Sequence, residues 1–140
     1  MKASLLPGIK LQHRFLVPST KTVPALYPEA EEFLAMPEVF ATGYMVGLLE
    51  WTCIKCVNPH LEWPIEQTVG THINVSHLAA TPPGMEVTVN VELIEVDGRR
   101  LVFTVEAHDG VDVISKGQHE RFVINRERFD AKVAEKRKRT

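Results

Sequence analysis

Glu50 is the residue of this 140-residue chain whose type and surroundings most favour chemistry. It lies in an almost unbroken apolar stretch from residue 40 to residue 57, which predicts a buried helix. Its helical neighbours at three and four residues carry no cation, and Lys55 lies about 140° around the helix axis. A buried carboxylate must find a distant partner or face a polar cavity. We therefore predict that Glu50 is catalytic. The alternative is that it reaches solvent or pairs structurally with an arginine such as Arg121.

His77 is a second candidate, because residues 68–80 alternate between two faces in a pattern that predicts a strand. The face that includes Ile73, Val75 and His77 is mainly apolar, whereas His72 lies on the other face. His77 should therefore point toward the predicted helix. The alternative is a core histidine that has only structural hydrogen bonds.

Thr42 begins the predicted helix, where free backbone N–H groups favour negative charge. It could also be a simple N-cap. Gly43 would let a ligand approach the backbone, as an oxyanion site requires. Thr42 lies two turns and about 80° from Glu50, so a substrate along the helix could touch both. With His77, we predict that a hydroxyl, a carboxylate and an imidazole share one pocket.

Cys53 and Cys56 have the spacing of a CxxC motif, with His60 nearby. They come late in the helix, where the dipole disfavours a thiolate, and no second pair of zinc ligands is evident. We expect both to be buried apolar residues and expect no metal site.

The elements that position these residues predict an α+β fold in one domain, residues 1–140. Residues 1–40 predict one short strand near 14–17 and then a loop or small helix. The long helix follows, and then strands at 68–80, 86–96, 99–108 and 111–125. Asp97-Gly98 and Asp109-Gly110 are signals of two-residue hairpins. Such a sheet can cover the helix on one side only, so its exposed edge should favour dimerisation.

Composition excludes several classes of protein. Hydrophobic residues make up 44% and charged residues 24%, as in soluble globular domains, and no apolar run is long enough to span a membrane. The net charge is −2, with a body of −6 and a basic tail of +4 over residues 126–140. We expect a cytoplasmic protein that does not bind nucleic acid, with the tail as a solvated helix end.

Several motifs together resemble the fluoroacetyl-CoA thioesterase family of hotdog-fold enzymes, over about residues 8–135. They are Tyr27-Pro28-Glu29, Pro37-Glu38-Val39-Phe40-Ala41-Thr42-Gly43, Met45-Val46-Gly47-Leu48, Glu50-Trp51, Ala79-Ala80-Thr81-Pro82-Pro83-Gly84, Ala107-His108-Asp109-Gly110-Val111-Asp112 and His119-Glu120-Arg121.

The resemblance implies a helix enveloped by an antiparallel sheet of about five strands, in a homodimer with active sites near the subunit interface. It implies catalytic roles for Thr42, Glu50 and His77, with support from Gly70 and Arg121. It also implies a lid of aromatic side chains before the helix, with Tyr27 among the substrate-binding residues. Phe33 is kept, but Met36 replaces a second lid phenylalanine.

The expected activity is hydrolysis of a short acyl-CoA, with coenzyme A present only as part of the substrate and no other cofactor. Two alternatives keep the same fold. One is a hydratase or dehydratase that acts on acyl thioesters. The other is a binding module for CoA esters without catalysis.

Overall fold

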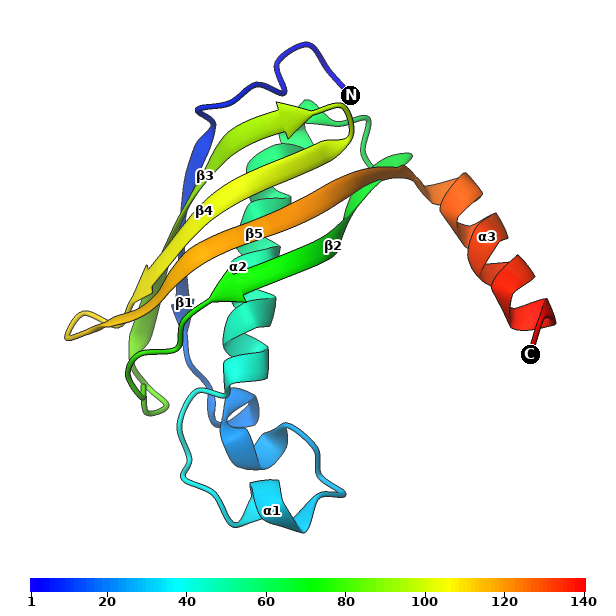
Figure 1. Cartoon of the computed structure of the whole chain (residues 1–140). Coiled ribbons are helices and arrows are strands. Elements are labelled where there is room, and N and C mark those ends of the chain that lie inside the picture. Colours follow the sequence, from blue (N-terminus) through cyan, green and yellow to red (C-terminus); the bar gives the residue numbers. More distant parts are fainter.

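The computed structural model describes all 140 residues and consists of one long helix partly enclosed by a curved antiparallel sheet (Figure 1). The five strands have the order β1-β3-β4-β5-β2, so β1 and β2 are the edges. In chain order the elements are β1 (Lys10–Leu16), η1 (Ser19–Lys21), η2 (Val23–Ala25), α1 (Glu31–Leu34), α2 (Thr42–Val57), η3 (Asn58–His60), β2 (Glu66–Val75), β3 (Glu86–Asp97), β4 (Arg100–His108), β5 (Val113–Asn125) and α3 (Arg126–Lys138). The α+β prediction is confirmed.

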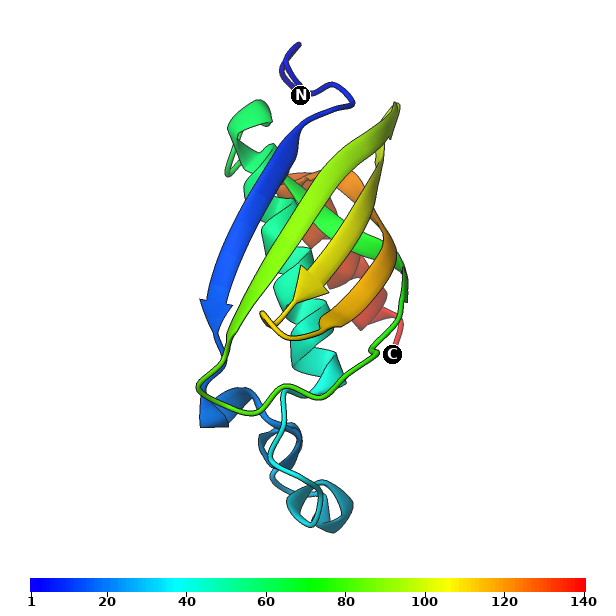
Figure 2. The same cartoon turned by 90° about the vertical axis from the view of Figure 1, so that its left-hand side faces the viewer.

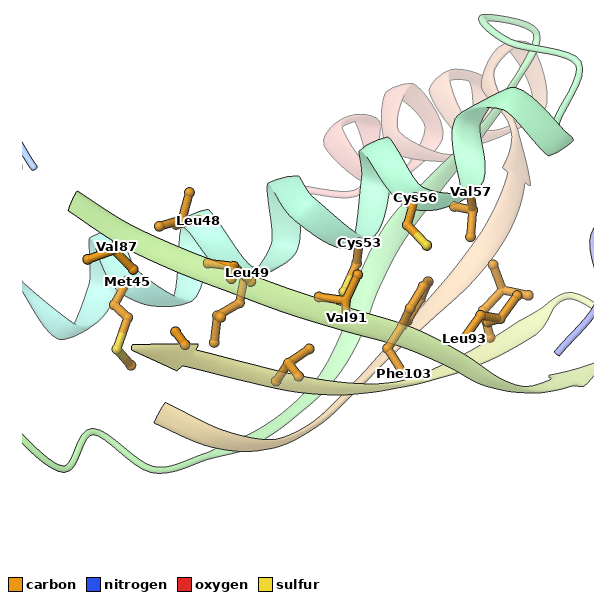
Figure 3. Close-up of a cluster of buried hydrophobic side chains, with 14 of the residues drawn as sticks. Met45, Leu48, Leu49, Cys53, Cys56, Val57, Val87, Val91, Leu93 and Phe103 are labelled. Atoms are coloured by element: carbon orange, nitrogen blue, oxygen red, sulfur yellow. The ribbon is translucent and has the colours of Figure 1, made fainter. Parts of the chain in front are cut away.

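Helix α2 buries one face against the sheet, mainly against β3 and β1. Figure 3 shows this face, with Met45, Leu49 and Cys53 pointing toward side chains from the strands. The opposite face is open, and it includes Gly43, Gly47 and the 46% exposed Trp51. A single curved sheet covers only one side of the helix, as expected (Figure 2). The helix is therefore not buried all round, although its sequence is apolar on nearly every face.

Strand β2 differs from its prediction at both ends. It begins at Glu66 and ends at Val75, five residues before the expected end. The N–H groups of Ser76 and Leu78 still donate to the carbonyls of Lys116 and Ile114 on β5, but no regular ladder continues. The pairing of β2 with β5 is also interrupted by a register shift between Gly70 and His72. This irregularity lies beside the site described below.

The two glycine turns differ from one another. Gly98 has a positive φ and connects β3 to β4 by a two-residue turn, which confirms the predicted hairpin, although the turn is Gly98-Arg99, one residue later than expected. The loop at Asp109 has four residues, so the prediction of a two-residue hairpin there is wrong. Oδ1 of Asp109 accepts hydrogen bonds from the N–H groups of Val111 and Asp112, and the Thr81 hydroxyl donates to Oδ2. Burial opposes ionisation, but these bonds hold the pKa of Asp109 below its usual range.

Two segments extend from the body. The segment that contains η2 and α1 projects beyond the N-terminal end of α2, and α3 stands away from the sheet at the other end (Figure 1). Helix α3 has no buried residue, as expected for a solvated basic tail, and Asn125 caps it by accepting from the N–H of Arg128. No helix is both long and apolar enough to cross a membrane.

Candidate active site

Glu50 is held by Arg121 on the side of α2 that faces β2. Arg121 Nη1 donates to Glu50 Oε2 at 2.8 Å, and no hydrogen bond reaches Oε1. The Arg121 side chain is 4% exposed, whereas that of Glu50 is 38% exposed. Glu50 is therefore only partly buried and lies at the wall of a cavity, as one of the two expected outcomes required. The expectation of a distant partner was correct.

Arg121 is fixed by the strand beside it. Its Nε donates to Thr68 Oγ1 at 2.8 Å, and its Nη2 donates to the Thr68 carbonyl at 2.9 Å. A side chain clamped in this way has little freedom to follow Glu50, so it is Arg121 that determines where the carboxylate lies.

Gly70 makes the pair possible. A Cβ at this position would stand 2.7 Å from Glu50 Oε2 and 3.3 Å from Arg121 Nη1. Gly70 also faces Arg121 across the β2–β5 ladder. The glycine is therefore required by the close approach of two side chains and not by an unusual backbone conformation.

His119 is a residue of this site that sequence reasoning did not select. It is 2% exposed, and its ring stacks on Phe103 at a centroid distance of 6.4 Å. Its Nδ1 donates to the carbonyl of His72 at 2.7 Å, and its Nε2 lies 3.1 Å from Arg121 Nη1. Burial lowers the pKa of His119 and outweighs the hydrogen bond to the His72 carbonyl, which raises it, while the neighbouring Arg121 lowers it further. The one available signal was its position two residues before Arg121 on an alternating strand.

Thr42 and His77 form a second cluster at the N-terminal end of α2. Thr42 Oγ1 and His77 Nδ1 share a hydrogen bond of 2.7 Å. The N-cap of the helix is Ala41, so the hydroxyl of Thr42 is used for His77 and not for capping. The other ring nitrogen of His77, Nε2, is buried without any partner. Burial also lowers the pKa of His77.

The two clusters do not share one closed pocket. Glu50 lines an open cavity of about 400 Å³ whose other walls are Val46, Gly70, Thr71, His72, Ile73 and His119. Thr42 and His77 do not line it. Val46 lies four residues from both Thr42 and Glu50, so the three form one stripe along α2. The structure therefore places the predicted hydroxyl, imidazole and carboxylate in line along α2 rather than at one point.

The remaining predicted residues lie near the Thr42 end. A Cβ on Gly43 would stand 3.2 Å from Leu26, so the space beside this glycine is filled by the chain itself. Tyr27 and Phe33 stack at a centroid distance of 5.8 Å, and Met36 is 49% exposed. None of the three lines the Glu50 cavity.

The cysteines lie within the core. Cys53 and Cys56 are free and buried, which confirms their prediction as apolar core residues. Burial raises the pKa of both thiols, that of Cys56 to about 11.

Comparison with known proteins connects this geometry to a family. The family described as fluoroacetyl-CoA-specific thioesterase matches residues 24–127. The chain is also 56% identical, over 136 residues and 97% of both chains, to the fluoroacetyl-CoA thioesterase of Streptantibioticus cattleyicolor. The chain belongs to the fluoroacetyl-CoA-specific thioesterase family. It is therefore a thioester hydrolase, which favours hydrolysis over the hydratase and binding-module alternatives.

Solved structures agree with this membership. A structure of the fluoroacetyl-CoA thioesterase FlK matches with a TM-score of 0.92 at 56% identity, over 95% of this chain and 98% of that one. A hot-dog-like protein from Thermanaerovibrio acidaminovorans matches at 21% identity with a TM-score of 0.78, over 93% of this chain and 91% of that one. The hotdog fold that the sequence resemblance implied is confirmed.

Proposed function

We propose that this thioester hydrolase releases free coenzyme A and a short carboxylic acid from an acyl-CoA of the fluoroacetyl-CoA type. The relative named above is a fluoroacetyl-CoA thioesterase. Mutant forms of FlK have been solved with acetyl-CoA and with fluoroacetate and CoA. The observation that carries the proposal is the free Oε1 of Glu50, which Arg121 holds at the wall of an open cavity.

Glu50 is the proposed catalytic carboxylate, and two routes fit its position. In the first, Oε1 attacks the thioester carbonyl, the C–S bond breaks, the thiolate of CoA leaves, and water then hydrolyses the acyl-enzyme anhydride. In the second, Oε1 takes a proton from a water molecule that attacks the same carbonyl. Oε2 stays bound to Arg121 in both routes.

His77 is the proposed acid–base group. A lowered pKa keeps its imidazole neutral at pH 7, so the ring can accept a proton from the substrate or return one to the leaving thiolate. Its Nε2 is buried and has no hydrogen-bond partner in the protein, so this nitrogen is the one left for the exchange. Thr42 holds the other nitrogen and so orients the ring.

Backbone N–H groups at the start of α2 are the proposed donors to the part of the substrate that lies beside Thr42, two helical turns from Glu50. The first helical hydrogen bond runs from the N–H of Met45 to the carbonyl of Ala41, so the N–H groups of Thr42 and Gly43 have no helical acceptor. The positive end of the helix dipole favours negative charge at the same place. No other cofactor is part of this proposal.

The aromatic segment before α2 is the proposed lid over the acyl group. Tyr27 and Phe33 form a stacked pair in a segment that lies at the Thr42 end of the helix (Figure 1). Met36 is longer and more deformable than a phenylalanine, so it would select less sharply among small acyl groups.

A homodimer is proposed because the chain leaves an apolar helix face uncovered. Trp51 is 46% exposed, and a Cβ on Gly47 would meet nothing within 4 Å. Ile73, on edge strand β2, is 39% exposed beside the Glu50 cavity. A second copy would cover this face and close the cavity. Sedimentation equilibrium should give twice the chain mass; a monomer at micromolar concentration would contradict this assembly.

The activity is tested by following free thiol release from acetyl-CoA, fluoroacetyl-CoA and longer acyl-CoAs. We expect release from the short substrates, with kcat/KM falling as the acyl chain lengthens. Crotonyl-CoA serves as a control for hydratase chemistry. Hydration of crotonyl-CoA without thiol release from any substrate would contradict the proposed function.

A further inference from the structure

His119 has an arrangement of hydrogen bonds that only a neutral imidazole can make. Its Nδ1 lies 2.7 Å from the carbonyl of His72, which can only accept, so Nδ1 carries the proton. Its Nε2 lies 3.1 Å from Nη1 of Arg121, which can only donate. Nε2 must therefore offer a lone pair, and a second proton on the ring would place two donors face to face.

The surroundings of His119 keep it fixed in this state. The β2–β5 ladder has a register shift between Gly70 and His72. Beside this shift, the His72 carbonyl accepts the hydrogen bond from the His119 ring. On the other side the ring stacks on Phe103 of β4. The charged groups around it are Arg121 and Glu120 on its own strand and Glu50 on α2, and the His72 side chain on β2 is exposed.

Arg121 Nη1 is the atom through which His119 can act on the reaction. Its two N–H groups are divided between Glu50 Oε2 at 2.8 Å and His119 Nε2 at 3.1 Å. Thr68 holds Nε and Nη2, so His119 supplies the remaining contact that fixes the plane of the guanidinium at its Glu50 end. His119 also lines the cavity into which Glu50 faces.

We infer that His119 is a positioning residue for hydrolysis, which acts as a hydrogen-bond acceptor for Arg121 and thereby sets the direction of the Glu50 carboxylate. This role rests on the proposed function of Glu50. Protonation of His119 would turn Nε2 into a donor, push Nη1 away and release the carboxylate. The neutral ring is therefore the active form, and its lowered pKa extends that form toward acidic pH.

Three variants distinguish a positioning role of His119 from a role in packing alone. His119→Gln keeps one amide donor for the His72 carbonyl and one oxygen acceptor for Arg121. His119→Phe keeps an aromatic ring against Phe103 but removes both hydrogen bonds. Phe103→Leu disturbs the same stack without touching the hydrogen bonds of the site. All three are compared by thermal unfolding, so that losses of activity are judged at known stability.

We expect His119→Phe to lower kcat by on the order of a hundredfold with a small change in KM, because a displaced catalytic group is costly. His119→Gln should recover most of that loss, and its activity should extend further into acid than that of the native enzyme. Phe103→Leu should lose stability but keep most of its kcat. The inference is overturned if His119→Phe and Phe103→Leu have the same kcat, or if His119→Gln is as impaired as His119→Phe.

Adding His119→Phe to the Glu50→Gln variant distinguishes a failure of this inference from a failure of the proposed function of Glu50. If His119 acts through the carboxylate, adding His119→Phe to Glu50→Gln should cause little further loss. A large further loss would overturn the inference while leaving Glu50 in its role. Full activity of Glu50→Gln alone would instead overturn the proposed function.

A spectroscopic readout is independent of turnover. With ¹⁵N-labelled histidine, the His119 ring should show a protonated Nδ1 and an unprotonated Nε2 at neutral pH. It should keep that pattern below pH 6.5, the ordinary value for histidine. A ring protonated at both nitrogens at neutral pH would contradict the inference.

Discussion

Arg121 Nη1 lies 2.8 Å from Glu50 Oε2, although 71 residues separate them in the sequence. Strand β5 brings the guanidinium to Glu50 on the side of α2 that faces β2, and Gly70 on β2 leaves the space that the pair needs. One carboxylate oxygen is thereby fixed while the other stays free at the cavity. Anything that changes this contact should change hydrolysis more than it changes folding.

Gly70→Ala should be a sensitive test of that contact. Its Cβ would stand 2.7 Å from Glu50 Oε2, so the carboxylate has to move away from Arg121. We expect kcat/KM to fall by roughly tenfold or more, with a small change in melting temperature. Asn74→Ala, at an exposed position of the same strand, serves as the control and should keep native activity. Equal activity of the two variants would contradict the close-approach argument.

Removal of the Thr42 hydroxyl should impair His77. Thr42→Val has nearly the same shape but cannot share a hydrogen bond with Nδ1, whereas Thr42→Ser keeps the oxygen. We expect Thr42→Val to lose roughly a factor of a hundred in kcat, and Thr42→Ser to lose far less. Steady-state kinetics with acetyl-CoA measures both. If Thr42→Val and Thr42→Ser have the same kcat, the hydroxyl does not orient the His77 ring.

The stability of the fold should fall on acidification. Burial lowers the pKa values of His77 and His119 below the ordinary value of 6.5, so the unfolded chain binds more protons than the folded chain just below that pH. The free energy of unfolding should therefore decrease from neutral pH through this window. Urea denaturation at several pH values measures how steeply the free energy of unfolding depends on pH, and His119→Gln should make this dependence weaker. A free energy that is constant across this range would contradict buried neutral histidines.

Met36→Phe should sharpen the choice of acyl group. A rigid aromatic ring in the segment that also carries Tyr27 and Phe33 would enclose a small acyl group more closely than a flexible thioether. We expect the ratio of kcat/KM for fluoroacetyl-CoA over acetyl-CoA to rise in the variant. A ratio unchanged from the native enzyme would exclude this residue from substrate selection.

The two thiols should be unreactive in the folded enzyme. Cys53 and Cys56 lie in the core, and burial raises the pKa values of both. We expect iodoacetamide to leave activity intact under native conditions and to label both cysteines only in denaturant. Rapid inactivation of the native enzyme would mean that the core opens readily.

Local patterns in the sequence predicted much of this fold. The apolar stretch that became α2 and the alternating strands β3 and β4 follow from periodicity alone. The loop at Asp109 was missed because its four residues are held by side-chain hydrogen bonds that a dipeptide signal does not reveal. The open face of α2 agrees with the expectation that one sheet covers only one side of the helix, but the apolar sequence alone could not show which side chains lie on that face.

The site was only partly accessible to the same reasoning. Glu50 stood out because nothing on its own helix could neutralise it, and Arg121 was foreseen as an alternative partner. His119 was not foreseen, because its contacts depend on the register of β5 against β2, where the ladder is irregular. Register between distant strands is set by the assembled sheet rather than by any local pattern.

The catalytic role of the Glu50 carboxylate is the central claim, and Glu50→Gln tests it most directly. The amide keeps the size of the side chain and an oxygen for Arg121, but it is neither a nucleophile nor a base. Thiol release from acetyl-CoA and fluoroacetyl-CoA should fall by about a hundredfold or more while the melting temperature changes little. Turnover equal to that of the native enzyme would contradict the account.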